Sequence, residues 1–304
     1  GVAMSCCYLA AAALMGGYVW KCAPRGPAKL AIAILPGGLM FPPIVESLVT
    51  NQKGTFCLLI VTTTFLLLQI RRPAVAGLCF GWLMFKPQLA LPIMLVMLWK
   101  RQFAFCLGCM GTLCLLGMVC LAVGLDANSQ FLRLLGAAPE YIYRHGYSVA
   151  SSHCVDSFFH GLIPDHPRKA RMLAATATVA LILLALRLVK GPIQCDSHRF
   201  ALQYSGLIVV TILISPHLYG YDLSLLLLPF VVIIILPRKG HDASMTKAAA
   251  YVALALFSLS GLSEYLARAT GVQVTVLLMG CLLYFLFAIA SSMRQDARGS
   301  IVSQ

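Results

Sequence analysis

The fold of this chain is decided by the stretch Ala76-Gly-Leu-Cys-Phe-Gly-Trp-Leu-Met-Phe-Lys-Pro-Gln-Leu-Ala-Leu-Pro92. It is apolar except for Lys86 and Gln88, which flank Pro87 in its middle. Proline removes a backbone donor and disfavours helix in the residue before it, so we expect a helix to break here. Lipid does not tolerate broken backbone, so the break should line a protein-enclosed or water-filled cavity. A lysine at such a depth is costly and is expected to be functional.

The charges around this stretch predict a hairpin. Arg71-Arg72 precede it, Lys100-Arg101 follow it, and Lys86 is the only charge between these two pairs. The intervening residues 73–99 are too many for one upright crossing of about 20 residues and too few for two. Since the positive-inside rule places both basic pairs in the cytoplasm, we expect two short helices that meet at Lys86-Pro87-Gln88 and turn back. The alternative is one long tilted helix, kinked at the proline, with the lysine snorkelling.

The composition predicts an integral membrane protein. Of 304 residues, 60% are hydrophobic and 11% are charged, and the mean hydropathy is +0.86. Soluble domains carry roughly 25% charged residues. We interpret the net charge of +13 as a signal for topology and for contact with anionic headgroups, and we expect no nucleic acid partner. Most of the 12 cysteines lie in apolar runs, where cysteine packs as a small hydrophobe, so we expect no metal site.

We expect an all-α polytopic bundle of about 11 transmembrane helices, which forms one integral membrane domain over residues 1–304. Pro36-Gly37-Gly38 should interrupt the second span, and a polar connector from Glu46 to Lys53 should follow it. Besides the two short hairpin helices, the expected spans are residues 2–20, 30–45, 54–70, 103–125, 170–189, 200–215, 221–236, 246–266 and 272–292.

The basic residues of the loops set the orientation. More of them fall on the side that holds Arg71-Arg72 and Lys100-Arg101, so this side should be cytoplasmic. In a cell (inner) membrane, this arrangement leaves Gly1 outside and the carboxy terminus in the cytoplasm. An odd number of spans with an outside start, and a first residue that is not methionine, lead us to expect a further span upstream of Gly1.

The long loop 126–168 is then extracytoplasmic. Residues 129–135 place apolar side chains on one face and Arg133 on another, which predicts a short interfacial helix near 129–136 lying on the membrane. Long loops are often functional, and aromatic residues interleaved with polar groups suit sugar faces and lipid headgroups. The alternative is an aromatic belt with solvated histidines. The residues of this kind are Tyr141, Tyr143, Arg144, His145, Tyr147, His153, Asp156, Phe158, Phe159, His160, Asp165 and His166.

A second polar break, Ile214-Ser-Pro-His-Leu-Tyr-Gly-Tyr-Asp222, separates two very apolar spans. By the predicted topology it lies on the outer side, as does the Lys86 turn. We therefore expect Lys86, Gln88 and His217 to line one outward-opening cavity, with Asp222 facing the same cavity. A plain loop with a capping serine and a structural His–Asp pair is the alternative.

Three stretches together resemble glycosyltransferase family 87, typified by polyprenol-phosphate-mannose-dependent mannosyltransferases of the C type (GT-C). They are Thr50-Asn51-Gln52 at the start of an apolar span, Gly77…Lys86-Pro87-Gln88, and Ser215-Pro216-His217…Tyr221-Asp222. The first motif usually reads Gly-Gln in the family, so Asn51 is a departure. The resemblance covers about residues 30–236 and rests on the order and spacing of the motifs together with the matching hydropathy.

The resemblance implies a GT-C-like bundle that transfers a hexose, often mannose, from a polyprenyl-phosphate sugar to a lipid or glycan acceptor outside the cytoplasm. The partners would be membrane lipids, this donor substrate and the acceptor, and no cofactor is implied. The residues expected to contact the donor phosphate are Lys86, His217 and Arg144, and those expected to bind sugar or acceptor hydroxyls are Gln52, Gln88, Tyr221 and Asp222.

The sequence does not decide which residue is catalytic. Transfer needs a general base, and C-type enzymes generally carry an acidic residue in the first external loop, which here would precede Gly1. Either that region lies upstream, or Asp156 or Asp222 takes its place, or the protein is an inactive family member. The alternative to an enzyme is a lipid or solute transporter. Transporters commonly repeat their broken helices, and no second copy of residues 81–88 occurs.

Overall fold

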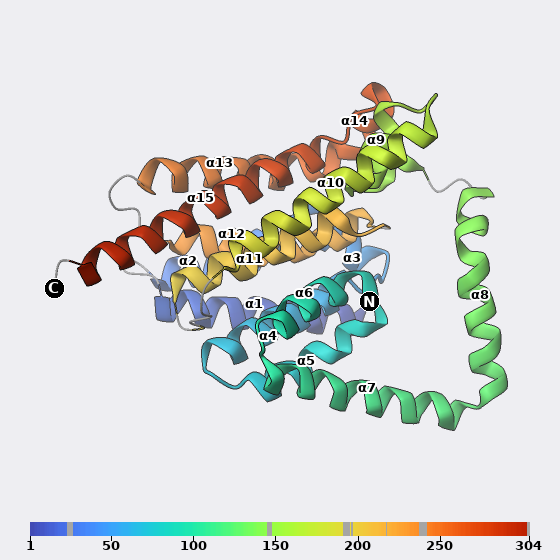
Figure 1. Cartoon of the computed structure of the whole chain (residues 1–304), viewed down its shortest axis with the longest axis horizontal. Helices are drawn as coiled ribbons and strands as arrows, with labels where there is room; N and C mark the ends of the chain where they lie inside the picture. The colour runs from blue at the N-terminus through green and yellow to red at the C-terminus, as the bar shows by residue number, and fades with distance from the viewer. Residues whose placement is uncertain are drawn as a thin grey trace.

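The structure is a computed structural model that describes residues 1–22, 27–144, 148–190, 195, 197–216, 218–236 and 242–302, without the side chains of 27, 135–144, 242 and 294–302. Within these ranges the chain is helical and forms no strand, only an isolated bridge (Figure 1). The elements are α1 (Val2–Cys22), α2 (Pro27–Leu39), α3 (Pro42–Val49), α4 (Gly54–Gln69), α5 (Pro73–Gly81), η1 (Trp82–Phe85), α6 (Pro87–Trp99), α7 (Phe103–Val123), α8 (Leu125–Arg144), η2 (Val149–Ser151), α9 (Val155–Leu162), α10 (Pro167–Leu188), α11 (His198–Ile214), η3 (Gly220–Leu226), α12 (Leu227–Ile235), α13 (Asp242–Leu259), η4 (Ser260–Leu262), α14 (Ser263–Thr270) and α15 (Val274–Val302), where η marks a 3₁₀ helix.

The all-helical membrane fold is confirmed, but the count of about eleven crossings is not. In the part of the chain that the structure describes, 5 helices are long and apolar enough to cross a membrane, or up to 6 if the bent pair α2–α3 is one span. Several expected spans form apolar helices of 10–17 residues, among them α4 and α11. These are shorter than the roughly 20 residues that one crossing needs.

The region around α2 and α3 differs from the expectation in two ways. α2 continues through Pro36 to Leu39, so the predicted interruption at Pro36-Gly37-Gly38 is wrong, and the chain bends instead between α2 and α3, by 57°. The first half of the predicted polar connector from Glu46 to Lys53 is helical, because α3 begins at Pro42 and ends at Val49. A proline suits the first helical position, where its missing amide hydrogen would have no partner.

The Lys86 stretch forms the predicted hairpin. α5 continues into η1, the helix breaks at Lys86 with φ −121° and ψ 76°, and α6 begins at the following proline. α5 and α7 run parallel in close contact, because a Cβ added to Gly77 would meet the Phe105 carbonyl and one added to Gly81 would meet Thr112. Since α7 starts beside the start of α5, α6 runs back along the bundle in the opposite direction to both helices (Figure 1). A single long kinked helix is not observed.

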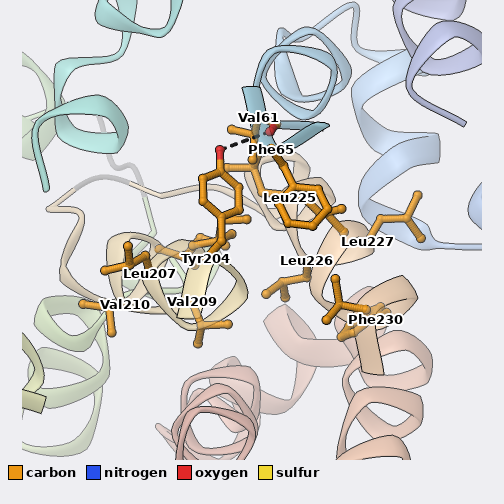
Figure 2. Close-up of a cluster of buried hydrophobic side chains, with 14 of the residues drawn as sticks. Val61, Phe65, Tyr204, Leu207, Val209, Val210, Leu225, Leu226, Leu227 and Phe230 are labelled. Atoms are coloured by element: carbon orange, nitrogen blue, oxygen red, sulfur yellow. Dashed lines mark hydrogen bonds between the residues drawn. The ribbon is translucent and has the colours of Figure 1, made fainter. Parts of the chain in front are cut away.

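α11 is the core of the bundle. Every residue from Phe200 to Leu213 is buried. The Tyr204 hydroxyl donates a hydrogen bond of 3.1 Å to the Val61 carbonyl, and the Tyr204 ring centroid lies 5.4 Å from that of Phe65. Figure 2 shows both residues of α4 packed with Tyr204 and with leucines of η3 and α12. Because lipid is as apolar as these side chains, packing holds the elements together, and α11 thereby fixes the positions of α4 and η3.

The expected helix in the 126–168 loop is present, but it is longer than predicted. α8 covers Leu125–Arg144 instead of about 129–136, and in Figure 1 it stands apart from the bundle and runs across its end. Gly124, with φ 108°, lets the chain turn sharply between α7 and α8. Leu132 and Leu134 are exposed on α8. Exposed leucines on an amphipathic helix are typical of a membrane surface, and this location stays a prediction.

Candidate functional site

Three segments that are far apart in the sequence meet at the end of the bundle where α3, α9 and α14 lie (Figure 1). These are the Lys86 break, the start of η3 and the segment between η2 and α9. Ser152 forms an isolated β-bridge with Tyr219, and the His153 backbone amide donates to the Leu218 carbonyl at 2.9 Å. The predicted outer loop therefore packs directly against the second polar break.

An ion pair joins the two polar breaks. The Lys86 ammonium lies 2.5 Å from the Asp222 carboxylate, and only 15% of the lysine side chain and 3% of the aspartate side chain are exposed. The same ammonium lies 4.8 Å from the centroid of the Tyr221 ring, which adds a cation–π contact. Because an unpaired charge at a buried site is strongly destabilising, this geometry makes each break depend on the other.

A cavity of about 270 Å³ opens beside this pair. The Tyr219 and Tyr221 rings stack with their centroids 5.8 Å apart and contribute to its wall. Carboxylate, amide and hydroxyl groups also face it, and together with the aromatic rings they suit a polyhydroxylated ring, which has apolar faces and a hydrogen-bonding edge. The lining residues are Pro42, Pro43, Glu46, Gln52, Ser151, His153, Tyr219, Gly220, Tyr221, Ser260, Gly261 and Glu264.

Glu46 is held in the cavity wall by α3 and η3. It lies one turn into α3, and its carboxylate accepts a hydrogen bond from the Tyr221 backbone. The backbone of η3 comes so close that a Cβ added to Gly220 would collide with the Glu46 carboxylate. On the neighbouring helix, a Cβ added to Gly54 would collide with the Tyr221 carbonyl. Gly54 is therefore needed for the close approach of η3 to α4, whereas a side chain at Gly220 would displace the Glu46 carboxylate.

Gln52 is positioned by the turn between α3 and α4. Its backbone amide donates to the Ser47 carbonyl at 2.9 Å, and the Ser47 hydroxyl donates to the Gln52 carbonyl at 2.8 Å. The preceding Asn51 has φ 54°, the left-handed region in which glycine is favoured and asparagine is among the best tolerated alternatives. This conformation gives a physical reason for the glycine that the Gly-Gln motif usually carries.

The far wall of the cavity comes from α14 and from the segment before α9. Glu264 forms an exposed ion pair with Arg268, at 2.5 Å. His153 is buried, with its Nδ1 atom 2.9 Å from the Thr275 hydroxyl, and burial lowers the pKa of His153 to about 4. The histidine is therefore neutral near pH 7 and acts there as a hydrogen-bonding group, not as a cation.

The structure separates the predicted site residues into groups. Gln52 and Tyr221 line the cavity, whereas Lys86 and Gln88 are not among its lining residues. The cavity expected to join Lys86, Gln88 and His217 stays a prediction, because His217 lies outside the described residues. Asp156 lies on α9, outside the lining, with its carboxylate 3.5 Å from His160. Two of the predicted phosphate contacts cannot be placed, because His217 and the Arg144 side chain lie outside the described residues.

The two acidic cavity residues, Glu46 and Glu264, were missed from the sequence. Glu46 had a signal that could have been used, because it is the only acidic residue before Asp126 and follows Pro42-Pro43, a helix start. Glu264 had none, because nothing local indicates that α14 lines the same cavity as α3. No group of three or more His, Cys, Asp or Glu side chains that could hold a metal ion occurs among the described residues.

Comparison with protein families identifies a match that covers most of the chain. The model of glycosyltransferase family 87 matches residues 1–216, which agrees with the family predicted from the three motifs. The match ends before Tyr221 and Asp222, so it covers Lys86 and its proline but not the partner of that lysine. No curated protein and no solved structure gives a match to this chain.

Proposed function

This chain belongs to glycosyltransferase family 87, and from that premise we propose that it transfers a hexose from a polyprenyl-phosphate sugar to a lipid or glycan acceptor. Mannose is the proposed hexose, and the outer face of the cell membrane is the proposed site of transfer. The observation that carries the proposal is the cavity between α3, η3 and α14, because it joins stacked tyrosines to hydrogen-bonding groups at the end of an apolar bundle.

The proposed sugar site is the cavity itself. Gln52 and the stacked pair Tyr219–Tyr221 offer an amide and two aromatic faces to a ring of hydroxyl groups. The only ionic side chains in its wall, among the described residues, are the carboxylates of Glu46 and Glu264. A wall with carboxylates and no lysine or arginine favours a neutral sugar over an anionic phosphate.

The donor phosphate would then lie outside this cavity, on the side of Lys86. One of the three ammonium hydrogens of Lys86 serves Asp222, and the others can donate to an anion. His217 and Arg144 remain proposed further contacts, and Gln88, in the first turn of α6, remains a proposed hydroxyl partner. Tyr221 contacts the lysine with its ring and lines the cavity, so it lies between the two proposed subsites.

A groove on the bundle offers a place for the polyprenyl tail. It has a volume of about 210 Å³ and an almost wholly apolar lining from α6, α10 and α11. Leu91 of this lining is one turn from Gln88, and Ile214 precedes the polar break that leads to Asp222. Both residues are close in the chain to the proposed phosphate subsite, and this proximity supports the groove as the site of the tail of a lipid-linked donor.

The test is sugar transfer by the whole chain, reconstituted in vesicles with radiolabelled polyprenyl-phosphate mannose and a membrane lipid extract as acceptor. We expect label in the lipid or glycan fraction, and Gln52→Ala should reduce the rate about tenfold through loss of a hydrogen bond to the sugar. The control Gln102→Ala removes the same side chain beside Arg101, where α7 begins, and should leave the rate unchanged. Folded protein that transfers no hexose from any polyprenyl-phosphate donor would overturn the proposal, as would equal effects of the two variants.

A further inference from the structure

The cavity holds a carboxylate that is placed to act on an acceptor hydroxyl. We propose that Glu46 is the general base of the transfer reaction. The inference rests on the proposed function and deepens it, because transfer to a hydroxyl group requires that the hydroxyl proton be removed as the new bond forms.

The other acidic residues near this end of the bundle are engaged or displaced. Asp222 is buried and its carboxylate is bound by Lys86, so it is neither accessible nor free to take a proton. Glu264 is bound by Arg268. Asp156 lies on α9, outside the cavity lining. Among the described residues, the ion pairs involve these three carboxylates and none of them includes Glu46.

The position of Glu46 fits the role. Its side chain is exposed in the cavity wall, which it shares with Gln52 and the stacked tyrosines. The Tyr221 backbone hydrogen bond and the contact with Gly220 hold the carboxylate on one side, which restricts its rotamers and leaves the cavity side for substrate. A fixed carboxylate within reach of a bound hydroxyl is the geometry that general base catalysis needs.

In the proposed transfer step, one bond to the anomeric carbon forms as another breaks. The acceptor hydroxyl gives its proton to a Glu46 carboxylate oxygen while its oxygen forms a bond to the anomeric carbon of the donor sugar. The bond between that carbon and the phosphate oxygen breaks, and its electron pair leaves with the polyprenyl phosphate. The proton then passes from Glu46 to water through the opening of the cavity.

The experiment compares Glu46→Gln with the unchanged chain. Glutamine keeps an oxygen that can accept the Tyr221 hydrogen bond, but it cannot take a proton. We expect the transfer rate to fall about 10²–10⁴-fold, with binding of polyprenyl-phosphate mannose and the unfolding temperature retained. Asp165→Asn is the control, since it removes an exposed carboxylate outside the cavity lining and should leave the rate unchanged.

A second variant separates catalysis from positioning. Glu46→Ala should be inactive, and added formate should restore part of its rate by serving as an external base, whereas a purely structural role predicts no rescue. The proposal would be overturned by a Glu46→Gln enzyme that transfers at more than a tenth of the normal rate, or by larger losses from Glu264→Gln or Asp156→Asn. In either case, transfer by the unchanged chain would leave the proposed function standing, so the two failures are distinguishable.

Discussion

Lys86 and Asp222 form an ion pair of 2.5 Å although 136 residues separate them in the sequence. Each belongs to a polar break in an otherwise apolar part of the chain, and each is largely enclosed by the bundle. The ion pair explains how both breaks are tolerated, because each buried charge has the opposite charge as its partner. It also fixes the Tyr221 ring, which contacts the lysine and lines the cavity.

The first prediction is that the two charges are coupled in stability. Lys86→Met should lower the free energy of unfolding by about 3–5 kcal/mol, because it leaves the Asp222 carboxylate buried without a partner. The double variant Lys86→Met/Asp222→Leu should recover most of this loss, since neither charge then remains. The measurement is a double-mutant cycle from denaturant unfolding in detergent.

The exposed pair of α14 supplies the control for this cycle. Arg268→Gln breaks an ion pair in which 62% of the arginine and 41% of the glutamate side chain are exposed, so its cost should stay below about 1 kcal/mol. If Lys86→Met costs no more than Arg268→Gln, or if the double variant is no more stable than the single one, the pair does not hold the two breaks together.

The second prediction concerns the stability of the fold at low pH. Burial lowers the pKa of His153 from 6.5 to about 4, so the unfolded chain binds a proton in this window and the folded chain does not. The contribution of His153 to stability is therefore complete above pH 6.5 and is lost as the pH falls to 4, by about 3 kcal/mol in all. His153→Asn should unfold with a weaker pH dependence between these values. His166→Asn changes an exposed histidine, and its free energy of unfolding should depend on pH as in the unchanged chain. Identical pH dependence in the unchanged chain, His153→Asn and His166→Asn would contradict the role given to His153.

The hairpin and the family were predictable because their signals are local. Pro87 removes a backbone donor and disfavours helix at Lys86, and the helix breaks there, although α2 continues through Pro36. The three motifs carry the family resemblance in a fixed order, and the family match supports it over residues 1–216. The conformation of Asn51 shows the same principle, since a positive φ explains why glycine or asparagine stands there.

The cavity was less predictable because its parts come from distant helices. Glu46 was assigned to a connector, whereas α3 places it in a helix that faces η3 and α14. Hydropathy could not predict the partner of Lys86. It identifies each isolated charge in an apolar segment, but it does not show which charges the fold brings together. The number of crossings is not confirmed for a different reason. Hydropathy detects apolar segments, but α4 and α11 are shorter than the roughly 20 residues that one crossing needs.

The third prediction tests the close approach of η3 to α4. A Cβ at Gly54 would collide with the Tyr221 carbonyl, and the Ser224 hydroxyl lies only 3.0 Å from the same point. Gly54→Ala should therefore cost about 1–3 kcal/mol in stability through overpacking and should reduce transfer by displacing Tyr221. Gly280→Ala is the matched control, because nothing lies within 4 Å of its added Cβ and alanine favours the helix. A Gly54→Ala protein as stable and active as Gly280→Ala would show that η3 can shift at no cost.

The last prediction fixes the orientation in the membrane. The end of the bundle that carries the cavity should face the outside, because the basic pairs Arg71-Arg72 and Lys100-Arg101 lie at the opposite ends of the hairpin helices. A cysteine introduced at Gly136 of α8 should react with an impermeant maleimide in intact cells, and one introduced at Arg101 should react only after permeabilisation. The unchanged chain gives the background from its own exposed cysteines, such as Cys6 and Cys114. The reverse labelling pattern would place the cavity on the cytoplasmic side, and a donor presented outside the cell could then not reach Glu46.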